Sequence, residues 1–336
     1  MHTVVLPDLA VPLAPLTTLR LGGPARRLVD AETADEVVEA LREPALVIGG
    51  GSNLVIADEG WPGTVVRIST RGRRVERRPD GSVLLTVEAG EEWDDVVAAT
   101  VADGLGGLEC LSGIPGRTGA VPVQNVGAYG VEIADALVDV DLLAGGVVRR
   151  VPAADLGLAY RTSVLKGRSD AVVLRVRIAL PGDALSAPVR YAELARALGV
   201  APGERVPAAV AREAVLALRR AKGMVLDPAD HDTWSAGSFF TNPVLATAPP
   251  GAPAWPVGDR FKVSAAWLIE HAGFRRGYPG PGGRVALSGR HVLALTHRGG
   301  GSTADLLALA AEVRDGVAAR FGVALTPEPV LVGCSL

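Results

Sequence analysis

The chain has 336 residues, of which 48% are hydrophobic and 21% are charged. This is the composition of a folded protein rather than of a disordered one, and the length allows two or three domains. The formal net charge of −3 gives no overall reason to bind nucleic acid or an anionic membrane, so any recognition of phosphate must be local.

The two cysteines, Cys110 and Cys334, lie far apart and match no metal-binding or redox spacing, which predicts two reduced thiols. The first twenty residues lack the basic start and the long apolar stretch of a signal peptide. The sequence contains no run of ~18 or more apolar residues, so no membrane span is predicted. We therefore expect a cytoplasmic protein.

The first predicted elements are short strands. Residues 45–48 read as a buried strand that runs into a turn of three glycines, and β-rich runs follow at 64–68 and 83–88. Over residues 91–103 the apolar residues recur at the spacing of an amphipathic helix, and Gly104 fits its end.

Two further strands are predicted at 137–143 and 171–179. In the second one, apolar residues alternate with Arg175 and Arg177, so we expect one face to be solvated. The alternating apolar residues are Val172, Leu174, Val176 and Ile178.

Helices dominate the predictions for the C-terminal part. A helix over 207–222 begins at Pro207, with Val210, Ala214, Val215 and Leu218 on its apolar face. Its end delivers Arg219, Arg220 and Lys222 to a loop. A helix at 264–272, a β-hairpin around 284–296 and a helix at 302–320 follow. The last helix begins with a capping box of Ser302 and Asp305, and its predicted buried stripe is Leu306, Leu309, Ala310, Val313 and Val317.

The first motif with chemical meaning is Gly49-Gly50-Gly51-Ser52-Asn53-Leu54. Glycines after a strand let backbone amides approach a pyrophosphate, and Ser and Asn add side-chain donors. A Rossmann site is excluded because the turn leads into another strand-like segment, not into a helix. Taken alone, three glycines are more often an ordinary turn.

The second motif is a loop rich in glycine and small polar residues over 113–129. With no charge beyond Arg117, it suits a backbone that wraps around a planar ring and a diphosphate. Two such loops about sixty residues apart are harder to explain as ordinary turns than one.

These and later motifs, in this order, resemble the UDP-N-acetylenolpyruvoylglucosamine reductase family. They are GGGSNL, GIPG, VQNVGAYG, YRTSVLK, AGSFFTNP and TPEPVLVG, and the resemblance spans roughly residues 15–333. It implies an α+β fold: a two-lobed FAD-binding domain of the vanillyl-alcohol-oxidase (PCMH) type and a smaller C-terminal α+β substrate-binding domain. We predict lobe 1 over 1–60, lobe 2 over 61–205 and the C-terminal domain over 206–336, because 200–206 is a turn-rich junction.

The resemblance also implies an activity. A non-covalently bound FAD would take hydride from NADPH and pass it from flavin N5 to UDP-N-acetylglucosamine enolpyruvate, giving UDP-N-acetylmuramate for peptidoglycan synthesis. We expect a monomer that binds neither nucleic acid nor membrane. The implied FAD contacts are Gly49, Gly50, Gly51, Ser52, Asn53, Leu54, Gly113, Ile114, Pro115, Gly116, Gly119, Gln124, Asn125, Gly127, Ala128, Tyr129 and Arg219.

Three residues match the family's catalytic positions. Ser238 would protonate the substrate carbon, Arg161 would hold the substrate carboxylate, and Glu328 would polarise that carboxylate or hold a proton. The ordinary alternatives are a turn-capping serine and a surface salt bridge. Adjacent Tyr160 would either orient Arg161 or belong to the core.

The implied substrate contacts are Tyr160, Tyr191, Lys222, Asn242, Trp255 and His291. Tyr191 indicates the subgroup in which a tyrosine closes over the substrate diphosphate. One departure is Val330, where some relatives carry an arginine. No metal site is predicted, and we expect His271, His291 and His297 to be surface residues rather than ligands.

Two rival functions stay open from the sequence. An FAD oxidase of the same fold would consume oxygen, often with a histidine or cysteine attached to the flavin, but neither glycine loop contains a histidine. A non-catalytic flavin or nucleotide-sugar binding module is disfavoured by the joint presence of Arg161, Ser238 and Glu328.

Overall fold

The computed structural model describes residues 10–336, which form two compact units. The first contains Arg26–Gly50 and Gly63–Ala221, and the second contains Ala10–Ala25, Gly51–Pro62 and Lys222–Leu336. The first nine residues of the stretch that was compared with a signal peptide lie outside the described residues.

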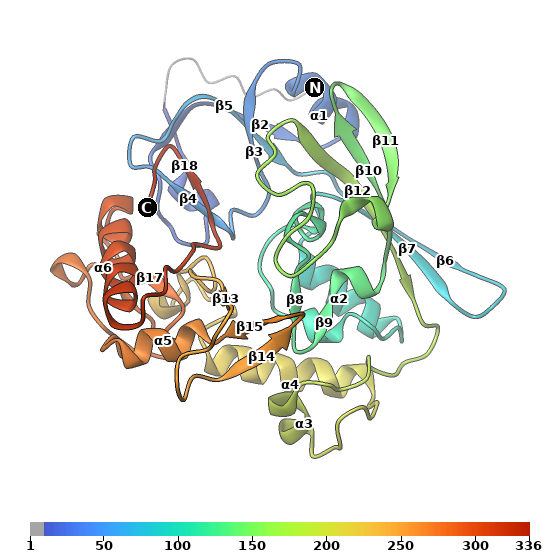
Figure 1. Ribbon diagram of the computed structural model, residues 1–336. Coiled ribbons are helices and arrows are strands. Elements are labelled where there is room, and N and C mark those ends of the chain that lie inside the picture. The colour runs from blue at the N-terminus through green and yellow to red at the C-terminus, as the bar shows by residue number, and fades with distance from the viewer. Residues whose placement is uncertain (1–9) are drawn as a thin grey trace. The chain divides into compact units, whose positions relative to one another are not determined.

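An antiparallel sheet of five strands organises the first unit, in the order β11-β10-β12-β7-β6 (Figure 1). These strands are β6 (Arg73–Arg77), β7 (Val83–Glu88), β10 (Leu137–Ala144), β11 (Val147–Pro152) and β12 (Ala171–Leu180). The central strand β12 pairs with β10 on one side and with β7 on the other, so its valines meet side chains from both neighbours. This confirms the strands predicted at 83–88, 137–143 and 171–179.

The expected solvated face of β12 is wrong. Arg177 is only 7% exposed and donates to Asp139 (2.6 Å) and Asp141 (2.9 Å), while Arg175 bonds Glu88 (2.6 Å) and Asp141. The alternation of apolar residues and arginines in β12 could not reveal these ion pairs, because the carboxylates belong to other strands. Arginines that face acids on neighbouring strands can be buried with their charge compensated.

A second sheet and four helices complete the first unit. The parallel pair β3 (Ala45–Ile48) and β5 (Trp61–Ile68) belongs to a sheet with β2 (Pro24–Ala31). The helices are α1 (Ala34–Ala40), α2 (Trp93–Ala102), α3 (Ala192–Leu198) and α4 (Ala208–Ala221). Trp93 of α2 is 1% exposed, and its Nε1 donates to the Leu111 carbonyl (3.2 Å), which attaches the following loop to the core.

Helix α4 confirms the helix predicted after Pro207, with one error in its buried face. Val215 is fully buried in the core of the first unit, and Ala214 and Leu218 pack against that core, but Val210 is 51% exposed. Val210 lies in the first turn, before the helix reaches the core. The sequence assigned this helix to a C-terminal domain, whereas its contacts place it in the first unit. The three-part division itself stays a prediction.

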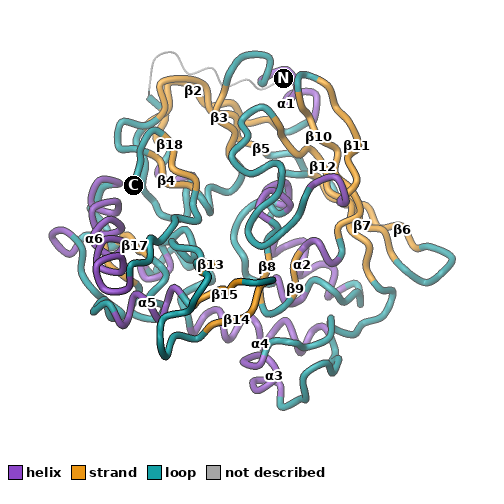
Figure 2. The backbone as a smooth tube through the Cα atoms, viewed as in Figure 1, coloured by secondary structure: helices purple, strands orange, loops and turns teal. Residues whose placement is uncertain are grey.

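Much of the first unit between α2 and β10 is loop with short 3₁₀ turns (Figure 2). It is interrupted only by the two-residue strands β8 (Gly127–Ala128) and β9 (Val131–Glu132). This stretch contains the second glycine-rich motif. The sheet and α2 support it, and most of its backbone amides and carbonyls form no strand pairing and can therefore face a ligand.

The second unit packs helices against short strands around its own core. Its helices are α5 (Ala265–His271) and α6 (Thr303–Phe321), and its strands are β1 (Val11–Pro12), β4 (Leu54–Ile56), β13 (Val244–Leu245), β14 (Ala254–Val257), β15 (Arg260–Val263), β16 (Val285–Leu287), β17 (Leu295–His297) and β18 (Val330–Val332). The hairpin of β16 and β17 and the parallel pair of β4 and β18 lie on this core.

The capped helix α6 forms as predicted. Ser302 and Asp305 make the reciprocal capping box, and the helix ends at Gly322 in the left-handed conformation (φ 67°). Its predicted stripe from Leu306 to Val317 is fully buried. Among the helices of residues 10–336, none combines the length and the apolar character that a membrane crossing needs.

Candidate functional site

The two glycine motifs meet within the first unit. Strand β3 ends at Ile48, and a side chain on Gly50 would place its Cβ only 2.8 Å from the Cα of Gly116. The same atom on Gly49 would lie 3.2 Å from the Arg117 side chain. The two loops are therefore in direct backbone contact, which only glycine permits at this distance.

Arg117 joins the two loops to the end of β7. Its guanidinium donates to the Gly90 carbonyl and pairs with Glu92 (3.0 Å), while its Nε is buried without a hydrogen-bond partner. Burial lowers the pKa of Arg117, although the neighbouring Glu92 opposes that shift. The only charged side chain of the GIPGRTG stretch is thus a half-buried cation, paired with Glu92, directly beside the glycine loops.

The start of the GIPG loop is clamped between two helices. The Gly113 amide donates to Asp94 Oδ1 of α2 (2.6 Å), and its carbonyl accepts from Arg219 Nη2 of α4 (3.2 Å). Arg212 of α4 holds Asp94 with two bonds, of 2.6 and 2.9 Å. Burial alone would raise the pKa of Asp94, but the bonds from Arg212 and Gly113 outweigh it and hold the pKa below its ordinary value.

Strained backbone gathers at the predicted site. Of the four described non-glycine residues with positive φ, three are predicted site residues: Asn125 (47°), Tyr129 (51°) and Arg161 (54°). A left-handed residue that is not glycine costs on the order of 1 kcal/mol or more, and such residues cluster where function requires them. This observation comes from the backbone alone and coincides with positions selected from motifs.

Asn125 and Arg161 tie the loop around β8 to the YRTS segment. Asn125 is 1% exposed; its Nδ2 donates to Glu132 (2.7 Å) and to the Ala159 carbonyl (3.2 Å). Arg161 Nη2 donates to the Gly127 carbonyl (2.8 Å). Both side chains position the loop, and the predicted FAD contact of Asn125 remains a prediction.

Aromatic side chains surround Arg161 and the second glycine loop. The Arg161 guanidinium lies 5.4 Å from the ring centre of Tyr160, which favours orientation of the arginine over a core role because Tyr160 is 38% exposed. Tyr129 meets Tyr191 edge to face at 5.5 Å. Burial raises the pKa of Tyr129 to about 12, so its hydroxyl stays protonated and can donate a hydrogen bond at neutral pH.

The first unit fits a flavin dinucleotide. The contact of Gly50 with Gly116 keeps side chains away from the backbone amides that would meet a pyrophosphate. The half-buried Arg117 cation lies there, and the loops themselves carry no acidic side chain that would repel phosphate. The predicted phosphate contact Arg219 lies against the same loop through Gly113.

Two predicted catalytic residues lie on hydrogen-bonded segments of the second unit. The Glu328 amide donates to the Phe239 carbonyl (2.9 Å), directly after Ser238, and the Phe239 amide donates to the Leu293 carbonyl (2.7 Å). Asn53 joins the same region, because its carbonyl accepts from the Val330 amide (2.9 Å). The segments that carry Ser238 and Glu328 are far apart in the sequence but are thus joined by a backbone hydrogen bond.

The predicted substrate contacts of the second unit lie in four different segments. Asn242 follows the Ser238 motif, and its Oδ1 accepts from the Ala265 amide at the start of α5 (2.9 Å). Trp255 of β14 is 49% exposed, His291 lies in the turn between β16 and β17, and Lys222 directly follows α4. The His291 amide joins a network of polar contacts around Asp232, and Gly223, which follows Lys222, passes beside it.

Several residues of the site were missed by sequence reasoning. Asp94, Arg212 and Glu132 order the first unit's loops, and Asp232 and Ser288 order the second unit's segments. A charged residue on an amphipathic helix reads as a solvated face, so no local pattern pointed to Asp94 or Arg212.

His297, expected at the surface, is 6% exposed; this expectation is wrong. It lies in β17 and its Nε2 accepts from the Gly301 amide (3.1 Å). Burial lowers its pKa. In the described part of the chain, no group of three or more His, Cys, Asp or Glu side chains is arranged to hold a metal ion.

Comparison with known proteins agrees with this geometry. Residues 25–151 match the FAD binding domain model, and residues 227–332 match the model for the C-terminal domain of UDP-N-acetylenolpyruvoylglucosamine reductase. The chain is 63% identical to the UDP-N-acetylenolpyruvoylglucosamine reductase of Saccharopolyspora erythraea, over 96% of this chain and 95% of that one. It is 56% identical to that of Mycolicibacterium gilvum, over 97% and 96%.

A solved structure matches over nearly the full length as well. The crystal structure of UDP-N-acetylenolpyruvylglucosamine reductase (MurB) from Thermus caldophilus superposes with a TM-score of 0.68 at 26% identity, covering 96% of this chain and 98% of that one. The predicted fold class, an α+β chain with an FAD-binding domain of the vanillyl-alcohol-oxidase type and a smaller C-terminal domain, is confirmed. The chain therefore belongs to the UDP-N-acetylenolpyruvoylglucosamine reductase family of FAD-dependent oxidoreductases.

Proposed function

We propose that this chain uses NADPH to reduce UDP-N-acetylglucosamine enolpyruvate to UDP-N-acetylmuramate, a step of peptidoglycan precursor synthesis. The observation that supports it most directly is the backbone bond between Glu328 and Phe239, which makes Ser238 and Glu328 neighbours. We also propose that it acts in the cytoplasm as a monomer, and that the FAD-binding part consists of two lobes, over 1–60 and 61–205.

FAD would be held by the two glycine loops and by Arg219. Bound there, it would supply the hydride that it receives from NADPH to one carbon of the enolpyruvyl double bond. Asp94 keeps the Gly113 segment in place for this contact, because it accepts from the Gly113 amide and is itself held by two bonds from Arg212. Arg117 contributes positive charge beside the diphosphate.

Addition of hydride leaves negative charge on the substrate carboxylate and requires a proton on the adjacent carbon. Arg161 supplies a permanent positive charge for the carboxylate, and its left-handed backbone with the bond to Gly127 gives it one orientation. Ser238 donates the proton to carbon, and Glu328 polarises the carboxylate or holds a proton.

The UDP half of the substrate would be bound by the remaining predicted residues. Lys222 and the amide nitrogen of Asn242 supply donors for the diphosphate, since the Asn242 oxygen is already occupied by α5. Tyr191 is 46% exposed and rests its ring edge to face with Tyr129, so it is available to close over the diphosphate. Trp255 and His291 would be further contacts to this half of the substrate.

An anaerobic turnover assay tests this proposal. Purified protein incubated with NADPH and UDP-N-acetylglucosamine enolpyruvate should form UDP-N-acetylmuramate, identified by mass spectrometry, in amounts equal to the NADPH consumed. NADPH consumption that requires oxygen, with no reduced sugar formed, would instead establish an oxidase.

A further inference from the structure

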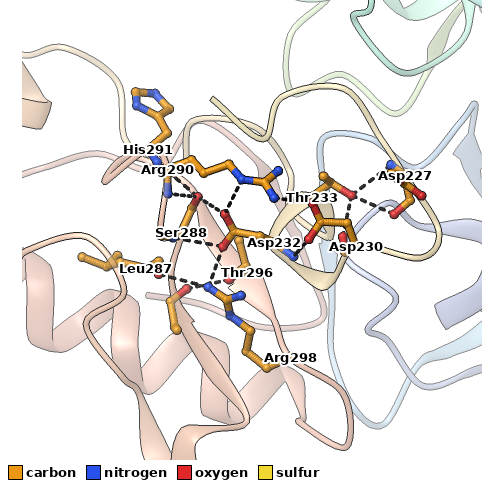
Figure 3. A network of polar contacts seen from close by, with 12 residues as sticks. Asp227, Asp230, Asp232, Thr233, Leu287, Ser288, Arg290, His291, Thr296 and Arg298 are labelled. Atoms are coloured by element: carbon orange, nitrogen blue, oxygen red, sulfur yellow. Dashed lines mark hydrogen bonds and ion pairs between the residues drawn. The ribbon is translucent and has the colours of Figure 1, made fainter. Parts of the chain in front are cut away.

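The Asp232 carboxylate lies buried at a junction of several segments in the second unit (Figure 3). It belongs to the 3₁₀ turn His231–Thr233, six residues before Ser238. Its Oδ1 accepts from the Gly289 amide (3.0 Å) and from Arg298 Nη2 (2.5 Å), and its Oδ2 accepts from the Ser288 hydroxyl (2.8 Å). One side chain thus joins the turn before the serine motif to the hairpin of β16 and β17.

The Ser288 hydroxyl extends this connection to His291. Its oxygen accepts from the amides of Arg290 (3.0 Å) and His291 (3.1 Å), so its single hydrogen is directed to Asp232. The backbone turn that carries the predicted substrate residue His291 is therefore held through Ser288 by a carboxylate oxygen (Figure 3).

The segment that carries Ser238 is bound to the same hairpin on both sides of the serine. The His297 amide donates to the Trp234 carbonyl (3.0 Å), and the Phe239 amide donates to the Leu293 carbonyl (2.7 Å). A shift of the hairpin relative to Asp232 would consequently move Ser238.

The segment that carries Lys222 passes beside Asp232 and Arg290. A side chain on Gly223 would place its Cβ 3.2 Å from the Asp232 carbonyl oxygen and 3.5 Å from Cδ of Arg290. Gly223 has a positive φ of 65°, so the chain turns sharply here after Lys222. The chain directly after Lys222 thus passes close to Asp232, as do the segments that lead to Ser238 and to His291.

Charge around Asp232 is balanced. Arg298 pairs with it at 2.5 Å, and Arg290 lies 3.7 Å from it while pairing with Asp230 at 2.7 Å. Two arginines thus face two aspartates. Asp232 is buried, whereas the side chains of Arg290 and Arg298 are 41% and 29% exposed. A buried carboxylate with compensated charge contributes little net stability compared with an apolar side chain, but it can specify a single arrangement of the segments that it joins.

We propose that Asp232 is a positioning residue for the oxidative half-reaction. Through Ser288, Gly289 and Arg298 it fixes the turn before Ser238 against the hairpin that carries His291, so that both segments keep one arrangement around the UDP-sugar. This proposal rests on the function proposed above, and in particular on Ser238 as the proton donor.

The substitution Asp232→Asn tests it with little change in size. If the Asn amide nitrogen faces Ser288, two donors meet and the Ser288 hydroxyl loses its acceptor. If the nitrogen faces the other way, the Gly289 amide and Arg298 lose theirs. Since a displacement near 1 Å can slow a reaction on the order of 100-fold, we expect reoxidation of the reduced flavin by saturating enolpyruvyl sugar to slow about 10- to 100-fold. Flavin reduction by saturating NADPH should change less than about 3-fold, because Ser238 has no part in it.

Ser288→Ala is the second variant. It removes only the link to the His291 turn and leaves the pair of Asp232 with Arg298, so it keeps the test valid if D232N does not fold. S288A should slow the oxidative half-reaction in the same direction, and the double variant should be little slower than D232N alone, because both changes break one connection.

Asp305→Asn is the matched control. Asp305 also accepts two bonds from an arginine, Arg284 (3.0 and 3.0 Å), and one from a backbone amide, that of Ser302 (3.1 Å), but it caps α6 instead of joining the Ser238 segment. D305N should lower the melting temperature while leaving both half-reactions within about 3-fold of the unchanged protein.

The outcomes separate the two proposals. If the unchanged protein is not reoxidised by the enolpyruvyl sugar, the proposed function fails. If it is, but D232N and S288A keep its oxidative rate and only lower the melting temperature as D305N does, or slow both half-reactions equally, then Asp232 only stabilises the fold and the positioning role is overturned.

Discussion

Ser238 is followed directly by a residue, Phe239, whose backbone amide and carbonyl are both bonded to other segments. The Phe239 amide donates to Leu293 and the Phe239 carbonyl accepts from Glu328. This leaves the serine in a backbone that cannot rotate freely, as a proton donor to one face of an alkene requires. A hydroxyl is a weak acid, but a carbanionic intermediate is a strong base, so the transfer is chemically reasonable.

Replacing Ser238 by Ala should therefore separate the two half-reactions. We expect reoxidation of the flavin by the enolpyruvyl sugar to slow by roughly 10² to 10⁴, the usual contribution of a general acid, while reduction by NADPH remains nearly unchanged. Stopped-flow absorbance of the flavin measures both rates. S235A, in the same segment, is the control, and equal loss of both rates in S238A would contradict the assignment.

At single residues, the sequence motifs did not predict backbone conformation or burial. The motifs identified Asn125, Tyr129 and Arg161, but not that all three have left-handed backbone, because non-glycine residues rarely adopt it. Similarly, His297 was expected at the surface and lies buried, and Trp234, whose ring centre lies 5.7 Å from that of His297, is far away in the sequence.

Helices α2 and α4 act as a frame for the second glycine loop. Asp94 comes from one helix and Arg212 and Arg219 from the other, and all three converge on Gly113 or on each other. Their separation along the chain explains why the helices were predictable while their joint contact was not: periodicity reports which face of a helix is apolar, not which charged side chain meets which partner.

The substitution Asp94→Asn should weaken FAD binding. Asn keeps one acceptor oxygen but loses the charge that pairs with Arg212. With its nitrogen at the Oδ2 position it loses one bond from Arg212, and with its nitrogen at the Oδ1 position it loses the Gly113 amide and the other Arg212 bond. Asp94 is 35% exposed, so one lost hydrogen bond to this charged group costs about 1.5 kcal/mol, and we expect a loss of FAD affinity of about 10-fold, measured by the flavin retained after dialysis and by titration. Asp170→Asn removes the exposed pair with Arg168 and should leave FAD affinity unchanged.

The N-terminus of α6 predicts a specific dependence of stability on pH. The Arg284 guanidinium and the Ser302 amide and hydroxyl lower the pKa of Asp305 from 3.8 to about 2. Because the folded pKa is below the ordinary one, the stabilisation is fully present above about pH 4 and is lost as the pH falls toward about 2. The free energies of unfolding of the unchanged protein and of D305N should therefore differ at pH 6 and converge near pH 2. A difference that stays constant over this range would contradict the account.

At the scale of the whole molecule, the two units each contain predicted site residues held by contacts within that unit. The order of strands and helices followed from periodicity, capping residues and glycine turns, and the motifs selected the loops. The polar partners did not follow, because Asp232 with Ser288, like Arg177 with Asp139 and Asp141, pairs residues that only the tertiary fold brings together. The helix α4 was misassigned to the C-terminal part for the same reason: its apolar face does not say against which core it packs.

The most direct test of the account follows the flavin of the purified protein without oxygen. We predict that NADPH bleaches the absorbance of the oxidised flavin and that colour returns only when UDP-N-acetylglucosamine enolpyruvate is added. A protein that contains no flavin, or whose reduced flavin is reoxidised by oxygen but not by the enolpyruvyl sugar, would contradict it.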